Sequence, residues 1–198
     1  MKNFTTSFIL LITIFTSCSS DSELKKSVYI QDEQFPDLPQ YSEWGYNTFG
    51  AYYDRQAFKS NDREVPIKVI NQEGKTSFVF TGQKGSGYSY DNFTLTLTIT
   101  DFNPLTYVDL LQLNNTTLDL TDSKYEIVIK DIENTYTTQI ISGQFQITKA
   151  QNLLVDKKAE EVILSGKFDF QALIEGLPVT ISNGRFDVGV GNDNFYKY

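Results

Sequence analysis

The side chains of this chain that could do chemistry are mainly carboxylates, because the usual catalytic nitrogen and sulfur groups are scarce. The 198 residues contain no histidine and a single cysteine, Cys18. Histidine is the commonest general base and neutral metal ligand, so histidine-based triads and ordinary zinc sites are excluded. A pair of carboxyl groups would suffice for acid and base work on a glycosidic bond. Glu126, Asp131, Asp169 and Asp187 form the pool for such a pair.

No spacing in the sequence marks two of these acids as a catalytic pair. Asp169 and Asp187 each follow a phenylalanine in two similar stretches. This shared context favours an outward-facing, structural or interfacial role for both. We therefore expect no enzyme activity, and a carboxylate-dependent glycan hydrolase is the alternative.

Aromatic residues form clusters that could bind a ligand. They gather in residues 41–46, at positions 52 and 53, and in the stretch 82–90. Flat rings beside amides and carboxylates suit stacking on sugars, and loops on a rigid β scaffold often carry binding sites. The structural alternative is that the rings fill the rim of the fold with their polar ends in water. The binding hypothesis predicts a glycan contact through Trp44, Tyr46, Tyr88 and Tyr90.

Neither a phosphate site nor a metal site is predicted. Residues 82–87 are rich in glycine, but they lack the Lys-Ser/Thr ending of a phosphate-binding loop. Residues 187–194, and also Asp119 and Asp122, offer oxygen ligands without the twelve-residue calcium loop and its final glutamate. We expect a hairpin loop in the first case, solvated turns in the second, and no cofactor. The formal net charge of −8 argues against nucleic acid as a partner.

The amino-terminal residues form an export signal. Lys2 precedes an uncharged stretch over residues 8–15, and the small residues Thr16 and Ser17 stand before Cys18. A positive start, an apolar run of about 7–15 residues and small residues at a cut site are the parts of a secretory signal. The run is shorter than the roughly 20 residues needed to cross a bilayer. We predict a signal peptide over residues 1–17.

The position of Cys18 resembles the lipobox of bacterial lipoproteins, whose cysteine is acylated and becomes the first mature residue. Phe15 departs from the leucine of the commonest pattern. The alternative is a plain secretory signal, but a lone cysteine has no partner for an internal disulfide. Ser19 stands where some inner-membrane lipoproteins carry aspartate. The resemblance therefore implies a lipid anchor in the outer membrane, with the protein facing the cell surface or the periplasm.

The remaining chain divides into a tether and one domain. Residues 18–43 are polar and contain Pro36 and Pro39, which predicts a lipidated cysteine followed by a flexible tether. Residues 44–198 are expected to form a single β domain. Aromatic side chains make up 14% of the chain, and aromatic enrichment favours sheet. One short helix is expected over residues 103–112, with Asn103 as N-cap and Pro104 at the first helical position.

Alternation of apolar and polar residues predicts the strands. Residues 93–100 alternate Phe, Leu, Leu and Ile with threonine, which is typical of a half-buried strand. Stretches 141–147, 164–170 and 181–188 share an apolar residue, serine, glycine and then phenylalanine, and they predict a three-stranded meander. Glycine inside a strand marks a bulge or a close approach of backbone. We predict an all-β, antiparallel β-sandwich of about eight to ten strands, with a closed β-barrel as the alternative.

Three stretches carry a resemblance to a family. Residues 47–50 (Asn-Thr-Phe-Gly), 165–170 (Ser-Gly-Lys-Phe-Asp-Phe) and 180–187 (Thr-Ile-Ser-Asn-Gly-Arg-Phe-Asp) look like a group of small Bacteroidetes-type lipoproteins with an uncharacterised domain. The resemblance covers roughly residues 47–190 and implies an extracytoplasmic β domain on a lipid tether. It implies no catalytic residues.

These observations predict an outer-membrane-anchored lipoprotein whose β domain binds a ligand or partner without catalysis. The expected partners are the membrane, through the N-terminal lipid, and a glycan or an envelope protein. A structural envelope component that contacts other proteins through sheet edges is a further alternative.

Overall fold

The computed structural model of the protein describes residues 26–61, 65–86, 89–132 and 134–198. They form twelve strands and one short 3₁₀ helix. The strands are β1 (Thr48–Tyr53), β2 (Gln56–Lys59), β3 (Ile67–Gln72), β4 (Lys75–Ser86), β5 (Ser89–Thr100), β6 (Thr116–Asp119), β7 (Tyr125–Lys130), β8 (Thr135–Thr137), β9 (Gln139–Val155), β10 (Lys158–Ile174), β11 (Leu177–Val190) and β12 (Phe195–Lys197). The helix is η3 (Tyr107–Leu113). The predicted signal peptide and Cys18 lie outside the described residues.

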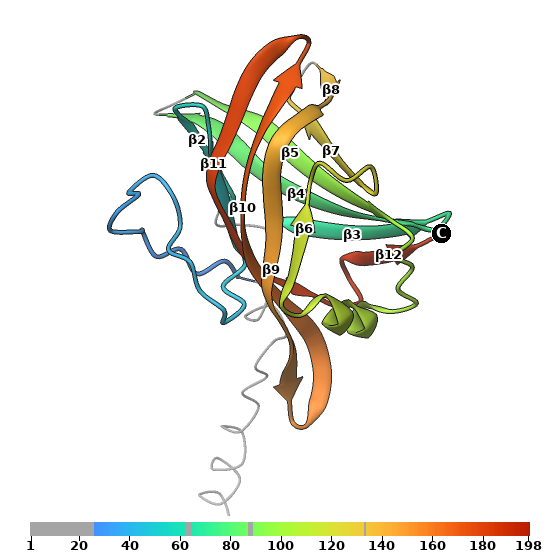
Figure 1. Cartoon of the computed structure of the whole chain (residues 1–198). Coiled ribbons are helices and arrows are strands. Elements are labelled where there is room, and N and C mark those ends of the chain that lie inside the picture. The colour runs from blue at the N-terminus through green and yellow to red at the C-terminus, as the bar shows by residue number, and fades with distance from the viewer. Residues whose placement is uncertain (1–25, 62–64, 87–88, 133) are drawn as a thin grey trace, which may run out of the picture.

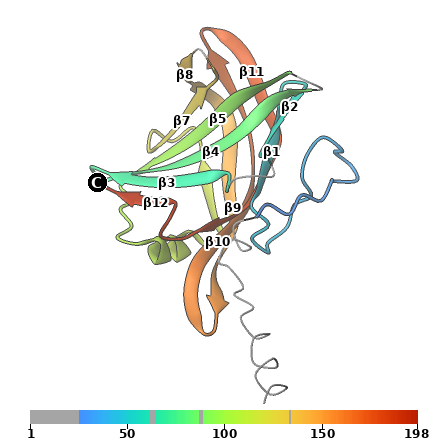
Figure 2. The ribbon, with the colours of Figure 1, turned by 180° about the vertical axis from the view of Figure 1, so that it is seen from behind.

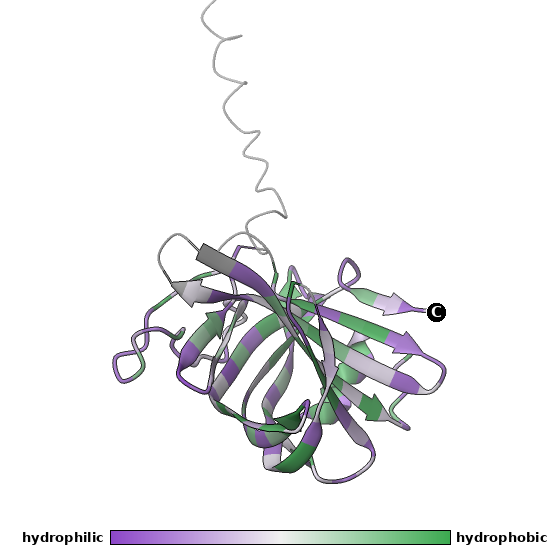
Figure 3. Ribbon diagram, turned by 90° about the horizontal axis from the view of Figure 1, so that it is seen from above, coloured by the Kyte–Doolittle hydropathy of each residue, from purple (hydrophilic) through white to green (hydrophobic). Residues whose placement is uncertain are grey.

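The strands form one mixed sheet that folds into two layers. Its order is β6-β9-β10-β11-β1-β2-β4-β5-β7-β8, with β3 pairing along β4 and β12 lying parallel to β3. The sheet curls back on itself (Figure 3), and β3, β4 and β5 lie over β9 and β10 (Figures 1 and 2). The predicted all-β, sandwich-like fold is confirmed. Within the described residues the sheet is not closed, and it has twelve strands where eight to ten were expected.

Strand β5 shows how the pattern builds the core. Phe93, Leu95, Leu97 and Ile99 are at most 6% exposed. The threonines between them point to the other face and are half-buried. Because successive side chains of a strand point to opposite faces, this strand presents a continuous apolar row to the interior.

Phenylalanine rings join the two layers. Phe49 of β1 stacks on Phe80 of β4 with ring centroids 4.8 Å apart, and on Phe168 of β10 at 5.9 Å. Phe145 of β9 stacks on Phe168 at 5.1 Å. Each of these rings is at most 1% exposed. Stacked pairs of this kind add about 0.5–1.5 kcal/mol beyond their buried area. The interior around these rings is therefore packed with side chains.

The three recurrent stretches lie side by side as β9, β10 and β11, which agrees with the expected meander. Their glycines stand opposite phenylalanines: Gly166 faces Phe186, and Gly184 faces Phe168. A Cβ on Gly166 would come within 2.5 Å of the Phe186 ring, and one on Gly184 within 2.5 Å of the Phe168 ring. The glycines therefore make room for the rings of the neighbouring strand, as the close-approach interpretation predicted.

Two-residue turns set the register of the long hairpins. Both turn residues have positive φ at Glu73-Gly74, Asp156-Lys157 and Glu175-Gly176. Such turns match the right-handed twist of the strands that they join. They place β3 against β4, β9 against β10 and β10 against β11.

The helix is where it was expected, but it begins later. Thr106 is its N-cap, and the Asp109 carboxylate accepts the amides of Leu105 and Thr106 at 2.7 and 2.9 Å. Asn103 is not the cap, because its side-chain oxygen accepts a hydrogen bond from Nδ2 of Asn71 at 2.7 Å. The stretch around Asn103 is thereby held to β3 and cannot start the helix.

The chain upstream of Trp44 packs against the sheet, so the folded part begins earlier than expected. The amide of Val28 donates to the carbonyl of Tyr46 at 2.8 Å, and Leu38 is fully buried. Arg185 of β11 forms an ion pair with Asp32 at 2.6 Å. We call residues 28–46 the docked segment. A flexible tether over residues 18–43 therefore does not describe positions 28–43, because long-range contacts hold them.

Candidate functional site

The outer face of β6, β9, β10 and β11 is polar, although the inner face is apolar. In β10, Phe168 and Phe170 are at most 3% exposed, whereas Lys167, Asp169 and Gln171 between and beside them are exposed. Alternation along the strand forces this division. The stretches that build the core therefore also determine which polar side chains reach the outside.

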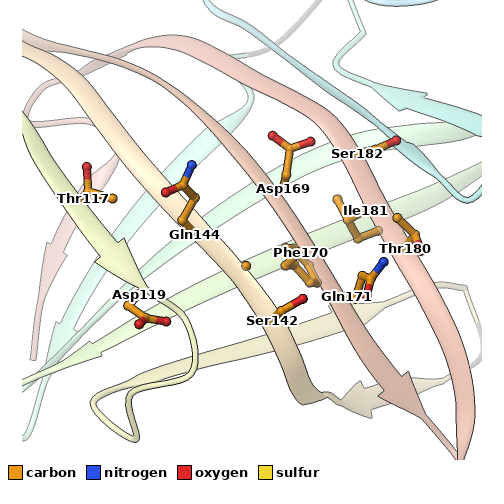
Figure 4. A pocket seen from close by; sticks show the side chains of 11 residues that line it. Thr117, Asp119, Ser142, Gln144, Asp169, Phe170, Gln171, Thr180, Ile181 and Ser182 are labelled. Atoms are coloured by element: carbon orange, nitrogen blue, oxygen red, sulfur yellow. The ribbon is translucent and has the colours of Figure 1, made fainter.

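The strand registers align these polar side chains in rows. Asp119 of β6 is opposite Gln144 of β9, and Gln144 is opposite Asp169 of β10. In the next row, Ser142 of β9 is opposite Gln171 of β10. Figure 4 shows side chains from all four strands around one hollow.

The hollow has a volume of about 650 Å³, and we call it the outer-face groove. Besides the five residues of the two rows, its polar lining includes Thr117, Thr180 and Ser182. Gly143 also lies in its wall, where a Cβ would come within 2.3 Å of Phe170. No described lysine or arginine lines the groove. It therefore offers amide, hydroxyl and carboxylate groups without a cation.

Both carboxylates of the groove are held by hydrogen bonds. Asp119 accepts the hydroxyl of Thr121 at 2.7 Å and its amide at 3.0 Å. These two bonds, the hydroxyl first, lower the pKa of Asp119 below its usual range. Asp169 accepts the amide of Asn183 at 2.7 Å. The bond to Asn183 orients Asp169, and Asp119 is an ionised acceptor at neutral pH.

Two of the four predicted aromatic contacts lie together outside the groove. Trp44 is 74% exposed, and Tyr46 is half-buried. Their backbone amides donate to the Asp187 carboxylate at 3.2 and 3.0 Å, so one turn of the docked segment carries both. Tyr88 and the side chain of Tyr90 lie outside the described part of the chain.

A polar link connects this turn to the groove along β10. The hydroxyl of Ser165 donates to Asp187 beneath the turn at 2.8 Å. Two positions on, the ammonium of Lys167 lies 4.7 Å from the ring centroid of Tyr41. Asp169 of the groove follows two positions later. At about 3.3 Å per residue, the turn and the groove are roughly 13 Å apart along the strand.

The four acids considered for catalysis do not converge. Glu126 is exposed on β7, and Asp131 accepts a hydrogen bond from the hydroxyl of Tyr136 at 3.3 Å. Asp169 alone lies in the groove. Asp187 points outward as expected, because its neighbours Phe186 and Val188 face the core, but it is only 1% exposed. Its side chain leaves the outer face of the sheet but is covered by the docked segment.

The described residues contain no group of three or more acidic, histidine or cysteine side chains that could hold a metal ion. Asp119, which was considered as a calcium ligand, lines the outer-face groove. No helix among the described residues has the length and apolar character to cross a membrane.

The chain matches no protein-family model, no curated protein and no solved structure. The resemblance to small Bacteroidetes-type lipoproteins therefore stays a prediction. The groove and its surroundings have to be interpreted from their own chemistry.

The polar residues of the groove were missed by the sequence interpretation. Gln144, Gln171 and Thr180 carry no motif, and they meet only through the registers of β9, β10 and β11. Their position in the sequence could have identified two of them. Gln144 follows the recurrent Ser-Gly pair, Gln171 follows Phe-Asp-Phe, and both lie at outward-facing positions of their strands.

Proposed function

We propose that this protein is an outer-membrane lipoprotein, anchored through Cys18, whose β domain binds a glycan at the outer-face groove without catalysis. The observation that carries the proposal is the composition of the groove. Its rows of glutamine, hydroxyl and carboxylate side chains suit a ligand that presents many hydroxyl groups.

The chemistry of the lining favours a neutral glycan. A sugar hydroxyl both donates and accepts, and a glutamine amide does the same, whereas a carboxylate only accepts. Asp119 and Asp169 can each take a hydroxyl hydrogen, and Gln144 and Gln171 can serve both roles. The volume of about 650 Å³ lies within the range of roughly 300–1,000 Å³ found for small-molecule sites. Anionic ligands are disfavoured by the two carboxylates.

The pKa of Asp119 argues against this residue as the general acid of a glycosidase. A glycosidase needs one carboxyl group whose pKa is raised, so that it can protonate the leaving oxygen. The pKa of Asp119 is lowered by its bonds to Thr121. This acid therefore acts as an acceptor for a hydroxyl group.

The edges of the sheet give little support to the structural alternative. The edge strands β6, β8 and β12 have four, three and three residues. Short edge strands are a common way for proteins to avoid pairing with other chains. Association through these edges is therefore a weaker explanation than ligand binding on the outer face.

The docked segment affects how far the domain reaches from the membrane. Val28 follows Cys18 by ten positions, and its amide is bonded to the carbonyl of Tyr46 in the domain. Ten residues span at most about 35 Å when fully extended. If Cys18 carries the lipid, the domain stays within that distance of the bilayer surface.

Glycan binding can be tested on a glycan array, followed by calorimetry with any glycan that binds. We expect the double variant Asp169→Ala/Gln171→Ala to weaken binding at least tenfold. Glu126→Ala, which removes an exposed strand carboxylate far from the groove, is the matched control and should bind like wild type. No binding on the array, or equal binding by the double variant, would reject the proposal.

Trp44 remains a predicted contact for longer glycans. Its backbone amide is bonded to Asp187, beyond Lys167 along β10, and its side chain is exposed, so a ligand longer than the groove is needed to contact it. Trp44→Ala should weaken binding of a long oligosaccharide and leave a short one unaffected. If Trp44→Ala weakened binding of the short oligosaccharide and left the long one unaffected, Trp44 would not be a contact for longer glycans.

The anchor is tested independently by growing cells with labelled palmitate. Label should enter the wild-type protein and be absent from Cys18→Ala. Equal labelling of the two would reject the anchor and leave the groove proposal standing.

A further inference from the structure

A second hollow lies at the end of the domain where the β10–β11 hairpin meets β5, β7 and β8, and we call it the end pocket. It has a volume of about 270 Å³ and shares no residue with the outer-face groove. Charged and aromatic residues line it: Tyr53, Lys84, Phe93, Asp131, Tyr136 and Glu175. The end pocket is therefore a different site from the one described in the proposed function.

The positive charge of the end pocket comes from Lys84. Its ammonium lies 4.9 Å from the ring centroid of Tyr53 and 5.5 Å from that of Phe93. These two rings meet edge to face with centroids 5.8 Å apart. No described carboxylate forms an ion pair with Lys84. Contact with aromatic faces stabilises an ammonium but leaves it able to bind an anion.

The position of Lys84 also disfavours a sugar in this pocket. A pyranose stacks on the face of an aromatic ring, and here the ammonium occupies the faces of Tyr53 and Phe93. A ligand would have to contact the ammonium itself. The chemistry of the end pocket thus differs from that of the outer-face groove.

The negative charges of the end pocket gather around Tyr136. Its hydroxyl donates to Asp131 at 3.3 Å. Burial raises the pKa of Tyr136, the side chain of Asn134 lowers it, and the charges of Asp131 and Glu175 raise it again. Both carboxylates are therefore close enough to influence this hydroxyl. The lining of the pocket therefore contains an ammonium group that can meet an anion and two carboxylates that can meet a cation.

The lining also has a buried apolar part, which we call the floor of the end pocket. Ile129, Ile174 and Val179 line the pocket and are at most 8% exposed, while Leu177 at the rim is 68% exposed. Binding of an aliphatic group here would be favoured by about 25 cal/mol for each Å² of apolar surface that it removes from water. The floor thus favours a ligand with an aliphatic side chain.

We propose that the end pocket binds a small zwitterion, an α-amino acid with an aliphatic side chain. The ligand carboxylate would meet the Lys84 ammonium, its ammonium group would meet Asp131 and Glu175, and its side chain would cover Ile129, Ile174 and Val179. The observation behind this assignment is the presence of opposite charges and buried apolar side chains in the lining of one pocket.

Calorimetry of the full chain with three matched probes tests the assignment. Leucine carries both charges, N-acetylleucine carries only the negative one, and leucinamide carries only the positive one. We expect leucine to bind at least tenfold more tightly than either analogue. Absence of leucine binding, or an analogue that binds equally well, would overturn the proposal.

Variants connect binding to the pocket. Lys84→Met keeps the aliphatic stem over the rings and should weaken leucine binding at least tenfold, with Glu126→Ala as the unaffected control. Glu175→Gln changes an exposed turn residue and should weaken binding at least threefold, so it decides the matter if Lys84→Met does not fold. Wild-type affinity in a folded variant would overturn the assignment. Glycan binding is read with different ligands and variants, so either proposal can fail alone.

Discussion

The carboxylate of Asp187 accepts a hydrogen bond from the backbone amide of Gly45 at 2.9 Å, across 142 positions of the chain. It also accepts the amides of the residues on either side of Gly45 and the hydroxyls of Ser42 and Ser165. Asp187 is 1% exposed, so these donors replace water around its charge. One side chain of β11 thus holds the end of the docked segment.

Replacement of Asp187 by alanine should therefore be strongly destabilising. The change leaves three backbone amides and two hydroxyls without their acceptor, and each buried unpaired group costs about 1–3 kcal/mol. Allowing for rearrangement, we expect a loss of about 3 kcal/mol or more in the free energy of unfolding, measured with urea. Asp91→Ala, at an exposed position of β5, is the control and should change it by less than about 0.5 kcal/mol. A loss in Asp187→Ala as small as that of the control would contradict this role.

Substitution of Gly184 tests the pairing of glycine with phenylalanine across strands. An alanine methyl group would come within 2.5 Å of the Phe168 ring. We expect Gly184→Ala to lower the free energy of unfolding by about 1–3 kcal/mol, the usual effect of overpacking. In a double-mutant cycle, Phe168→Leu should make the two losses less than additive, because it removes the ring contact and leaves only the contact with the Phe168 carbonyl oxygen, also 2.5 Å away. Additive losses would show that the ring is not the cause.

The local pattern of the sequence was sufficient for the strands and insufficient for the docked segment. Alternation over residues 93–100 and the recurrent stretches predict burial because each residue's own neighbours show it. Asp169 and Asp187 have the same local context, yet one is exposed and the other is buried. The difference comes from residues 42–46, far away in the chain, which cover only Asp187.

The groove could not be predicted for a related reason. Asp119, Gln144 and Asp169 form one row only because β9 pairs with both β6 and β10 in particular registers. Turns and bulges set those registers, and a shift by one residue would turn each side chain to the other face. Polar outward positions were therefore predictable, but their partners were not.

The ion pair between Asp32 and Arg185 predicts acid sensitivity of the docked segment. Partial burial would raise the pKa of Asp32, but the amides of Phe35 and Gln34 and the charge of Arg185 together lower it below 3.8. Because the folded-state pKa is the lower one, the stabilisation is complete above pH 3.8 and is lost as the pH falls through the folded-state value. Asp32→Asn should cost about 2 kcal/mol at neutral pH, since Arg185 is 8% exposed and keeps its charge.

The measurement for Asp32 is the free energy of unfolding of wild type and Asp32→Asn between pH 2 and pH 7. The advantage of the wild type should be constant above about pH 4 and shrink below it. If the difference in the free energy of unfolding were the same at pH 2 as at pH 7, it would not come from the charge of Asp32.

Tyr41 predicts the opposite dependence in alkali. Its hydroxyl donates to Glu43 at 2.9 Å. Burial, which is the largest influence, and this bond to Glu43 raise the pKa of Tyr41 to about 12, although the side chain of Thr148 acts in the other direction. Since the folded-state pKa lies above the usual value of 10.0, the stabilisation is complete below pH 10 and is lost as the pH rises through about 12.

Comparison with Tyr41→Phe isolates this contribution, because the other tyrosines titrate in both proteins. Wild type should be more stable than the variant by about 0.5–1.5 kcal/mol below pH 10, the usual value of one hydrogen bond. The difference should shrink as the pH rises above 10 and should reverse in sign before the pH reaches about 12. In a spectrophotometric titration, the tyrosinate absorbance missing from the variant should have its midpoint near 12. A midpoint near 10 for that absorbance would mean that the Tyr41 hydroxyl is neither buried nor bonded to Glu43 in solution, and that this part of the docked segment is not held to β10.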